Sequence, residues 1–383
     1  MASIRLRALS KHFGPVVAVS NLDLELPEGE LIAFLGPSGC GKTTTLRLIA
    51  GFERADTGEI YLGGKDVTAL PPERRDAGMV FQNYALFPHL TVFENVAFGL
   101  QMRKEPKDAI AKRVHAILEK VQLTGLDRRY PRQLSGGQQQ RTALARALVF
   151  NPTVLLLDEP LANLDAKLRE EMRFYIRHLQ QEFAITTIYV THDQAEALVL
   201  ADRVAVMRGG VLQQIGPPEE IYRRPRNAWV ADFVGVANLV LGTVTERTDG
   251  TVSVDTAVGC LRGEAQAEVA TGAEVFVSVR PESLRLLPAA GAESTGAGAG
   301  APTGEGAENR LSGVVEDRSY LGNLVDFRVR IAPDVVVRVQ AAPSSDYDVA
   351  DQVELSCTVE QTWIVQAEGE AAGGDDGAPR PLA

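Results

Sequence analysis

The sequence has few cysteines and no long apolar segment. Its 383 residues include three cysteines, Cys40, Cys260 and Cys357, too few and too scattered for a disulfide framework or a metal knuckle. Hydrophobic residues make up 45% of the chain, but the longest apolar runs, such as Thr153–Leu157, last only a handful of residues. A membrane-spanning helix needs roughly 20. We therefore expect free thiols in a reducing compartment and no transmembrane helix.

The sequence also lacks an excess of positive charge. Its formal net charge of -11 argues against a protein whose main task is to wrap nucleic acid, so no nucleic-acid partner is expected. The opening segment, MASIRLRALSKHFG, carries charges throughout and has no apolar core before a small-residue cleavage site. A secretory signal is therefore not expected, and we predict that the protein works in the cytoplasm.

The length favours two or three domains, and residues 3–235 read as strands that alternate with helices. This pattern predicts an α/β layer structure. Runs that are apolar on both faces belong in the middle of a largely parallel sheet, and they occur at Leu31–Leu35, Val154–Leu157 and Thr186–Val190. Glycine pairs at 63–64 and 209–210 predict hairpins, and hence an antiparallel portion beside the parallel core.

Two further domains are predicted from local patterns. A helical subdomain is inserted at about residues 88–150, where one helical stripe carries Ile110, Val114, Ile117, Leu118 and Val121. Residues 236–366 read as a small all-β domain with strands such as Glu274–Val279 and Val325–Val329. The Gly-, Ala- and Pro-rich segment 288–308 and the tail 367–383 have almost nothing to bury and are predicted to be disordered.

Residues 36–43, GPSGCGKT, match a phosphate-binding loop between a predicted strand and a predicted helix. The glycines let successive backbone N–H groups point at phosphates, the lysine supplies a mobile charge and the threonine hydroxyl suits Mg²⁺. The alternative is a flexible glycine turn with a surface lysine. We predict that ATP is bound by Gly36, Pro37, Ser38, Gly39, Cys40, Gly41, Lys42, Thr43 and Thr44.

The apolar strand in TVLLLDEP, residues 153–160, ends in two acids at the edge where such sheets bind ligands. Neighbouring side chains of a strand point to opposite faces, so Asp158 and Glu159 cannot share one task. We assign Asp158 to the metal shell and Glu159 to the base that polarises the attacking water. The alternative is that both carboxylates are simply solvated.

The segment LSGGQQQR at 134–141 opens a helix and is a second anion-binding device, although one chain needs only one. From residue 3 to 235 the chain resembles the ABC ATPase family, whose signature motif is this LSGGQ segment. The resemblance implies a P-loop NTPase domain whose signature loop caps ATP held by a second copy. The residues implied to act in trans are Ser135, Gly136, Gly137, Gln138 and Asp165.

The same resemblance gives roles to three more residues. Phe13 is similar to the aromatic that stacks on adenine, although it could be a core residue. Gln82 resembles the Q-loop glutamine that senses Mg²⁺ and water, and His192 resembles the switch histidine at the γ-phosphate. The implied catalytic set is Glu159, His192 and Gln82, and the implied Mg²⁺ set is Thr43, Gln82 and Asp158. One position departs from the pattern, because relatives more often have serine where this chain has Ala162 in its D-loop.

Beyond residue 235 the segments VRPESLRL and GVVEDRSYLGNLVDFRVRI resemble the OB-like, TOBE-type domain of maltose, sulfate, polyamine and ferric-iron importers. The runs GQQQR and FQNYALFPHLTVFENVAFGL look closer to the polyamine and ferric-iron type than to the sugar type. The alternative is the ATPase of a sulfate, thiosulfate, phosphonate or sugar importer. The aromatic-rich stretch Phe81–Phe98 is predicted to expose apolar character of the kind that marks an interface, with packing between subdomains as the alternative. The resemblance implies that this region receives a coupling helix from the membrane subunit.

The resemblance implies a subunit that dimerises with a second copy of itself on ATP and drives two membrane-spanning permease subunits. It would lie on the cytoplasmic face of the membrane and serve an extracytoplasmic solute-binding protein indirectly. A remote alternative is a soluble ABC ATPase with a regulatory role, and the β domain could itself be a regulatory module. The solute is chosen mostly by other chains.

Overall fold

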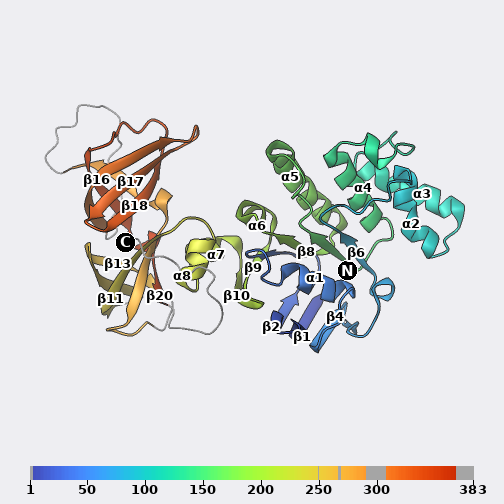
Figure 1. Cartoon of the computed structure of the whole chain (residues 1–383), viewed down its shortest axis with the longest axis horizontal. Coiled ribbons are helices and arrows are strands. Elements are labelled where there is room, and N and C mark those ends of the chain that lie inside the picture. The colour runs from blue at the N-terminus through green and yellow to red at the C-terminus, as the bar shows by residue number, and fades with distance from the viewer. Residues whose placement is uncertain (1–2, 249, 266–268, 290–307, 368–383) are drawn as a thin grey trace. The chain divides into compact units, whose positions relative to one another are not determined.

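The structure is a computed structural model that describes residues 3–248, 250–265, 269–289 and 308–367. The chain divides into two compact units, Met1–Pro218 and Glu219–Ala383 (Figure 1). This division falls earlier than the predicted boundary at 235, and the domain bounds stay a prediction. Of the loop predicted at 288–308 and the tail predicted at 367–383, residues 290–307 and 368–383 lie outside the described part of the chain.

The first unit contains two sheets that enclose a helix. The larger sheet has the order β10-β9-β3-β8-β7-β6, and all of its neighbouring strands are parallel except β9 and β10. Its strands are β3 (Leu31–Leu35), β6 (Ala77–Val80), β7 (Val154–Asp158), β8 (Thr186–Thr191), β9 (Arg203–Arg208) and β10 (Val211–Gly216). The antiparallel sheet, order β2-β1-β4-β5, is built from β1 (Ile4–Phe13), β2 (Val16–Leu26), β4 (Thr57–Leu62) and β5 (Lys65–Asp66). The predicted buried strands and both hairpins are confirmed.

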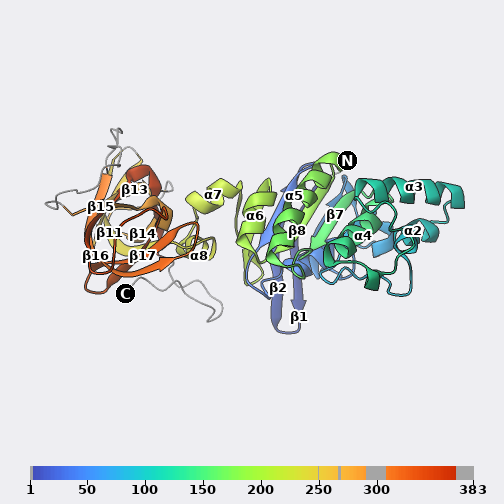
Figure 2. The same ribbon diagram turned by 90° about the horizontal axis from the view of Figure 1, so that it is seen from above.

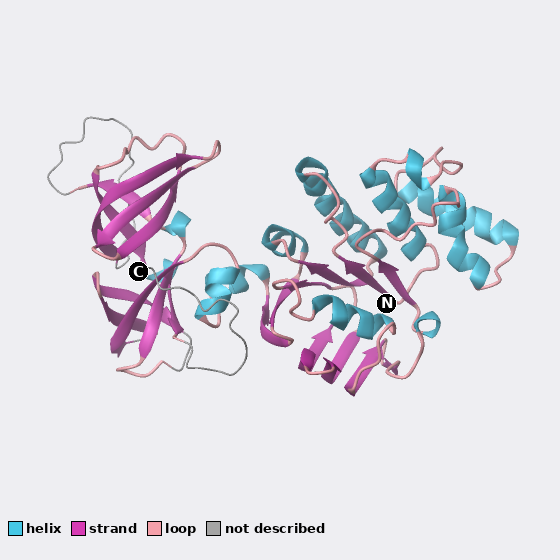
Figure 3. Cartoon of the chain, viewed as in Figure 1, coloured by secondary structure: helices cyan, strands magenta, loops and turns pink. Residues whose placement is uncertain are grey.

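Helices cover the larger sheet on both faces. They are α1 (Lys42–Ala50), α2 (Val92–Met102), α3 (Lys107–Lys120), α4 (Gly136–Leu148), α5 (Ala166–Phe183) and α6 (Gln194–Leu200), with short 3-10 turns η1 (Pro72–Arg74) and η2 (Pro131–Gln133). Helix α1 lies between the two sheets, whereas α5 and α6 lie on the opposite face of the larger one (Figures 1 and 3). Side chains alternate along β7, so Val154 and Leu156 pack in the core around α1, and Leu155 and Leu157 pack on the other face.

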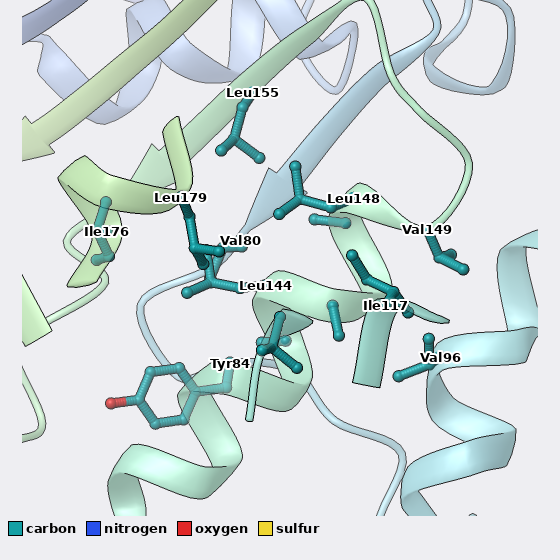
Figure 4. Close-up of a cluster of buried hydrophobic side chains, with 14 of the residues drawn as sticks. Val80, Tyr84, Val96, Ile117, Leu144, Leu148, Val149, Leu155, Ile176 and Leu179 are labelled. Atoms are coloured by element: carbon teal, nitrogen blue, oxygen red, sulfur yellow. The ribbon is translucent and has the colours of Figure 1, made fainter. Parts of the chain in front are cut away.

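The helical subdomain gathers α2, α3 and α4 at the β6–β7 end of the first unit (Figures 1 and 2). All five residues of the predicted stripe on α3 are buried, and they join a core that includes Val80, Leu144 and Leu155 (Figure 4). Helix α2 begins with a capping box in which Thr91 accepts from the Glu94 N–H and the Glu94 carboxylate accepts from the Thr91 N–H.

The aromatic rings of the predicted apolar patch at Phe81–Phe98 are partly covered. Phe81, Phe87, Phe93 and Phe98 are half-buried. The Phe87 and Phe98 rings lie 4.7 Å apart, and Phe81 lies 5.7 Å from Phe52. Each ring is thus covered in part and exposed in part, and the role of the stretch as the surface that receives a coupling helix stays a prediction. Aromatic composition alone does not show which rings find partners.

The described residues of the second unit form strands, apart from short helices and 3-10 turns. A closed barrel has the order β11-β12-β13-β20-β14, and a second sheet has the order β15-β19-β16-β17-β18. The elements are α7 (Pro218–Arg223), α8 (Ala228–Phe233), β11 (Asn238–Thr248), β12 (Thr251–Thr256), β13 (Gly259–Ala265), β14 (Glu274–Val279), η3 (Pro281–Ser283), β15 (Arg285–Pro288), β16 (Glu308–Tyr320), β17 (Val325–Ala332), β18 (Val335–Ala341), β19 (Gln352–Thr358), η4 (Val359–Gln361) and β20 (Thr362–Gln366). One valine-rich core fills both parts, with Phe327 fully buried. The predicted fold class, a P-loop α/β unit followed by an OB-like β unit, is confirmed.

Candidate nucleotide-binding site

The loop at 36–43 joins β3 to α1, and its backbone is closely surrounded. A Cβ atom on Gly36 would lie 2.3 Å from the Met207 carbonyl oxygen, and one on Gly41 would lie 2.2 Å from the Ala18 carbonyl oxygen. Gly39 and Gly41 have φ values of 81° and 105°, which L side chains rarely adopt. Sterics and backbone conformation therefore both require glycine here. The loop leads into the N-terminus of α1, where backbone N–H groups can bind an anion, although the Cys40 N–H donates to the Pro37 carbonyl oxygen at 3.3 Å.

Lys42 and Thr43 are held at the start of α1. Lys42 is buried, and its Nζ donates to the carbonyl oxygens of Gly36 (2.7 Å) and Pro37 (2.9 Å). The Thr43 hydroxyl donates to Asp158 Oδ1 at 2.9 Å. Burial raises the pKa of Asp158, and the nearby Glu159 adds to this effect, while Thr43, Arg47 and Lys42 oppose it. Asp158 is thus a desolvated carboxylate at the carboxyl end of a parallel strand, beside a hydroxyl oxygen.

Glu159 follows directly and meets two other predicted site residues. Its Oε2 lies 3.2 Å from His192 Nδ1 and accepts from Gln82 Nε2 at 3.3 Å. Its backbone N–H donates to the Val190 carbonyl oxygen at 3.0 Å, and its φ of 44° is left-handed. A non-glycine residue held in this region is strained, and such strain is concentrated at functional sites. The structure therefore brings Gln82, Glu159 and His192 together from three separate loops.

The signature segment forms the N-terminus of α4. Ser135 is the N-cap: its hydroxyl accepts from the Gln138 N–H at 3.3 Å, and the Gln138 side chain accepts from the Ser135 N–H at 3.0 Å. A Cβ atom on Gly137 would lie 3.2 Å from Leu168, so the loop packs closely on α5. In Figure 1, α4 lies on the face of the sheet opposite to α1. These residues form a second helix N-terminus, distinct from the one that follows the loop at 36–43.

The remaining predicted residues lie on the surface. Phe13 is 46% exposed, with Lys11 Nζ 5.2 Å from its ring centre, so it is available for stacking and is not a core residue. Asp165 accepts from the Leu168 N–H and caps α5. Ala162 lies in the short turn between β7 and α5, beside Glu159 and His192.

Sequence reasoning missed several residues that hold these loops. Asn163 Nδ2 donates to the Gln82 carbonyl oxygen at 2.8 Å and ties the D-loop to the Q-loop. Arg146 on α4 donates to the carbonyl oxygens of Tyr84 and Ala85, which follow Gln82. Arg146 lies on the same helix as the signature segment but after LSGGQQQR ends. It belongs to no motif that we recognised, so the sequence did not mark it as a site residue.

These features define the class of the protein: a loop that cradles phosphates, a lysine, a threonine paired with a strand-end carboxylate, and a second acid beside a histidine belong to a P-loop ATPase. The family model described as "ABC transporter" matches residues 19–162, and that of the "TOBE domain" matches residues 277–365.

Relatives match along most of the chain. A protein of Rubrobacter xylanophilus named "Spermidine/putrescine import ATP-binding protein PotA" is 48% identical, over 87% of this chain and 84% of its own. A protein of the same name from Oleidesulfovibrio alaskensis is 44% identical over 97% of both chains. A solved dimeric ATP-binding cassette, in a post-hydrolysis state with ADP and Pi, is 32% identical with a TM-score of 0.51, over 56% of this chain and 98% of its own.

The chain belongs to the ABC transporter ATP-binding family. It binds ATP and hydrolyses it in the service of transport. Among the described residues, no helix has both the length and the apolar character needed to cross a membrane.

Proposed function

We propose that this chain is the ATP-hydrolysing subunit of a polyamine importer. The observation that carries the proposal is similarity over nearly the whole chain, β unit included, to proteins named for spermidine and putrescine import. The names of these relatives give no other solute, and ferric iron, sulfate, phosphonate and sugar stay alternatives without a supporting observation. The substrate choice itself lies with the permeases and the binding protein.

ATP binding is proposed to use the loop 36–44, with Phe13 under the adenine. Mg²⁺ prefers hard oxygen ligands, and the Thr43 hydroxyl and Asp158 carboxylate present two oxygens 2.9 Å apart. The desolvated carboxylate, whose pKa burial raises, is better accommodated beside a cation, so these residues fit the ion. Gln82 would complete the protein ligands. The ion would neutralise charge on the phosphate oxygens.

Hydrolysis is proposed to depend on Glu159 as the base that accepts a proton from the attacking water. His192 Nδ1 and Gln82 Nε2 both lie within 3.3 Å of Glu159 Oε2 and hold the carboxylate in one orientation. A base that is already fixed in position loses little further conformational entropy on reaching the reacting atom, which lowers the activation free energy.

A second copy is proposed to complete each site. The segments carrying Ser135, Gly136, Gly137 and Gln138, and the D-loop with Asp165, would face ATP held by the partner. The dimeric state of the solved cassette supports this arrangement. The dimer would bind two permease subunits at the cytoplasmic face of the membrane, as a peripheral subunit.

The proposal is tested in proteoliposomes that contain this chain, the permeases and the solute-binding protein. We expect spermidine or putrescine, supplied on the binding-protein side, to stimulate ATP turnover, whereas ferric iron, sulfate and maltose leave it at the basal rate. Stimulation by one of those solutes instead of a polyamine would overturn the substrate assignment. The Glu159→Gln variant, which should not hydrolyse ATP, serves as the negative control for transport.

A further inference from the structure

A buried carboxylate outside the proposed catalytic set lies behind the proposed switch histidine. Glu196, on α6, is 4% exposed. Its Oε2 accepts from the Tyr189 hydroxyl at 2.8 Å and from the Thr191 hydroxyl at 2.7 Å. Thr191 ends β8 and directly precedes His192. Glu196 thereby fixes the end of the strand from which the histidine projects.

The other oxygen of Glu196 faces α5. Glu196 Oε1 lies 3.9 Å from Arg169 Nε, and Arg169 Nη2 donates to the carbonyl oxygen of Leu164 in the D-loop at 3.0 Å. One turn further along α5, Arg173 Nη2 lies 3.3 Å from Oδ2 of Asp193, the residue after His192. Two arginines of one helix therefore hold the two acids that follow the histidine.

These groups meet the proposed catalytic residues at one small cavity. It has a volume of about 50 Å³, and its lining includes Glu159, His192, Ala162, Arg169 and Glu196. Because Arg169 and Glu196 line this cavity together with Glu159 and His192, a displacement of either would change the packing around both proposed catalytic residues. The D-loop contributes to the same cavity through Ala162.

A neutral side chain would meet the packing needs of this position at a lower cost. Burial raises the pKa of Glu196, because the charged carboxylate has lost water, although the Thr191 and Tyr189 hydroxyls partly offset that loss. For an acid with a raised pKa, the ionised form opposes folding at neutral pH, and stability rises as the pH falls through the folded pKa. A carboxyl group kept at this buried position, beside the proposed switch histidine, points to a role other than stability.

We propose that Glu196 and Arg169 are positioning residues for hydrolysis, which fix the strand end that carries His192 and join it to the D-loop. The proposal rests on the proposed function, in which Glu159 and His192 act on ATP. Neither residue touches the nucleotide in this scheme. Their effect is transmitted through the orientation of His192 and, across the cavity, of Glu159.

The test compares Glu196→Gln and Arg169→Gln in the full-length protein. Because small misplacements of catalytic groups reduce rates up to about 100-fold, each variant should lower kcat roughly 10- to 100-fold while KM for ATP stays within about twofold. The double variant should be about as slow as the slower single variant, because the two residues act along one path. If Glu196→Gln does not fold, Arg169→Gln and Tyr189→Phe, which removes one donor to the carboxylate, carry the same expectation.

Gln180→Met is the matched control. Gln180 is 2% exposed on α5, the helix that carries Arg169, and its Nε2 donates to the carbonyl oxygens of Gly29 and Ile185, before β8 begins. Its loss should lower the unfolding temperature and leave kcat within about twofold, so a merely structural role is distinguishable.

Two results would overturn the inference: wild-type kcat in both Glu196→Gln and Arg169→Gln while Glu159→Gln is inactive, or an equal loss of kcat in Gln180→Met. The first leaves the proposed function intact. If Glu159→Gln itself turns over at the wild-type rate, the proposed function and the inference both fail.

Discussion

Replacing Glu159 by glutamine isolates the proposed proton transfer from everything else that this residue does. Glutamine has the same shape, and its Oε1 can still accept the 3.3 Å hydrogen bond from Gln82 Nε2. The contact with His192 Nδ1 at 3.2 Å can also persist as an amide contact. What the substitution removes is the capacity to take a proton.

The expected loss follows from that difference. A positioned general base contributes roughly 10²- to 10⁴-fold to a rate, which corresponds to about 3–5 kcal/mol in the activation free energy. ATP affinity should change by less than about twofold, because the side chains of Lys42 and Thr43 are held by Gly36, Pro37 and Asp158. The variant should therefore bind ATP and fail to turn it over.

The assay pairs phosphate release at saturating ATP with a nucleotide-binding titration on the same preparation. Glu171→Gln is the control, since Glu171 is exposed on α5 and the charge change is identical. A wild-type rate in Glu159→Gln would refute the assignment of the base. A wild-type rate at saturating ATP together with a lower ATP affinity in the titration would make Glu159 a binding residue.

Three other expectations follow from contacts in the structure. Ser135→Arg places a long charged side chain at the N-terminus of α4. It should leave ATP binding by single chains intact while abolishing hydrolysis and ATP-dependent dimerisation. Sedimentation with and without ATP checks this expectation, and an ATP-dependent dimer of the variant would contradict the shared site. Thr91→Ala should destabilise the chain by about 1 kcal/mol at pH 7. The Thr91 N–H, which alanine keeps, and the Thr91 hydroxyl, which alanine lacks, both lower the pKa of Glu94. The share of the difference that comes from the hydroxyl is therefore present above the ordinary value near 4.3 and should shrink as the pH falls through the lowered pKa, measured by denaturant unfolding. Phe327→Ala empties part of the β-unit core and should cost about 3–5 kcal/mol of that unit's unfolding free energy; calorimetry showing an unchanged unfolding transition would contradict its burial.

Residues whose patterns are local were predictable from the sequence. The strand Leu31–Leu35 is apolar on both faces because both faces are buried in cores, and this pattern predicts the strand. The spacing of glycine and lysine after it predicts the phosphate-binding loop. Glu196 was not found, since a glutamate on a short helix reads as an exposed charge until Tyr189, Thr191 and Arg169 are seen around it.

The pattern of hydrophobic residues also does not indicate which polar side chains are buried. Gln140, at the end of a run of three glutamines, is fully buried, although its neighbours in sequence give no sign that this position faces the core. The ring contacts after Gln82, such as that between Phe87 and Phe98, could not be read from the sequence either. Both features depend on tertiary partners, which a single sequence does not specify.

The shape of the phosphate-binding loop depends on the backbone of two different sheets, which pack closely against it. Ala18 belongs to β2 of the antiparallel sheet, Met207 belongs to β9 of the parallel one, and the N–H of Gly210, in the turn after β9, donates to the Cys40 carbonyl oxygen at 3.0 Å. The positions of these backbones decide whether the loop can curl. A family member with an intact GPSGCGKT but a bulkier residue at the position of Gly210 would carry the ATP motif and still be a poor nucleotide binder.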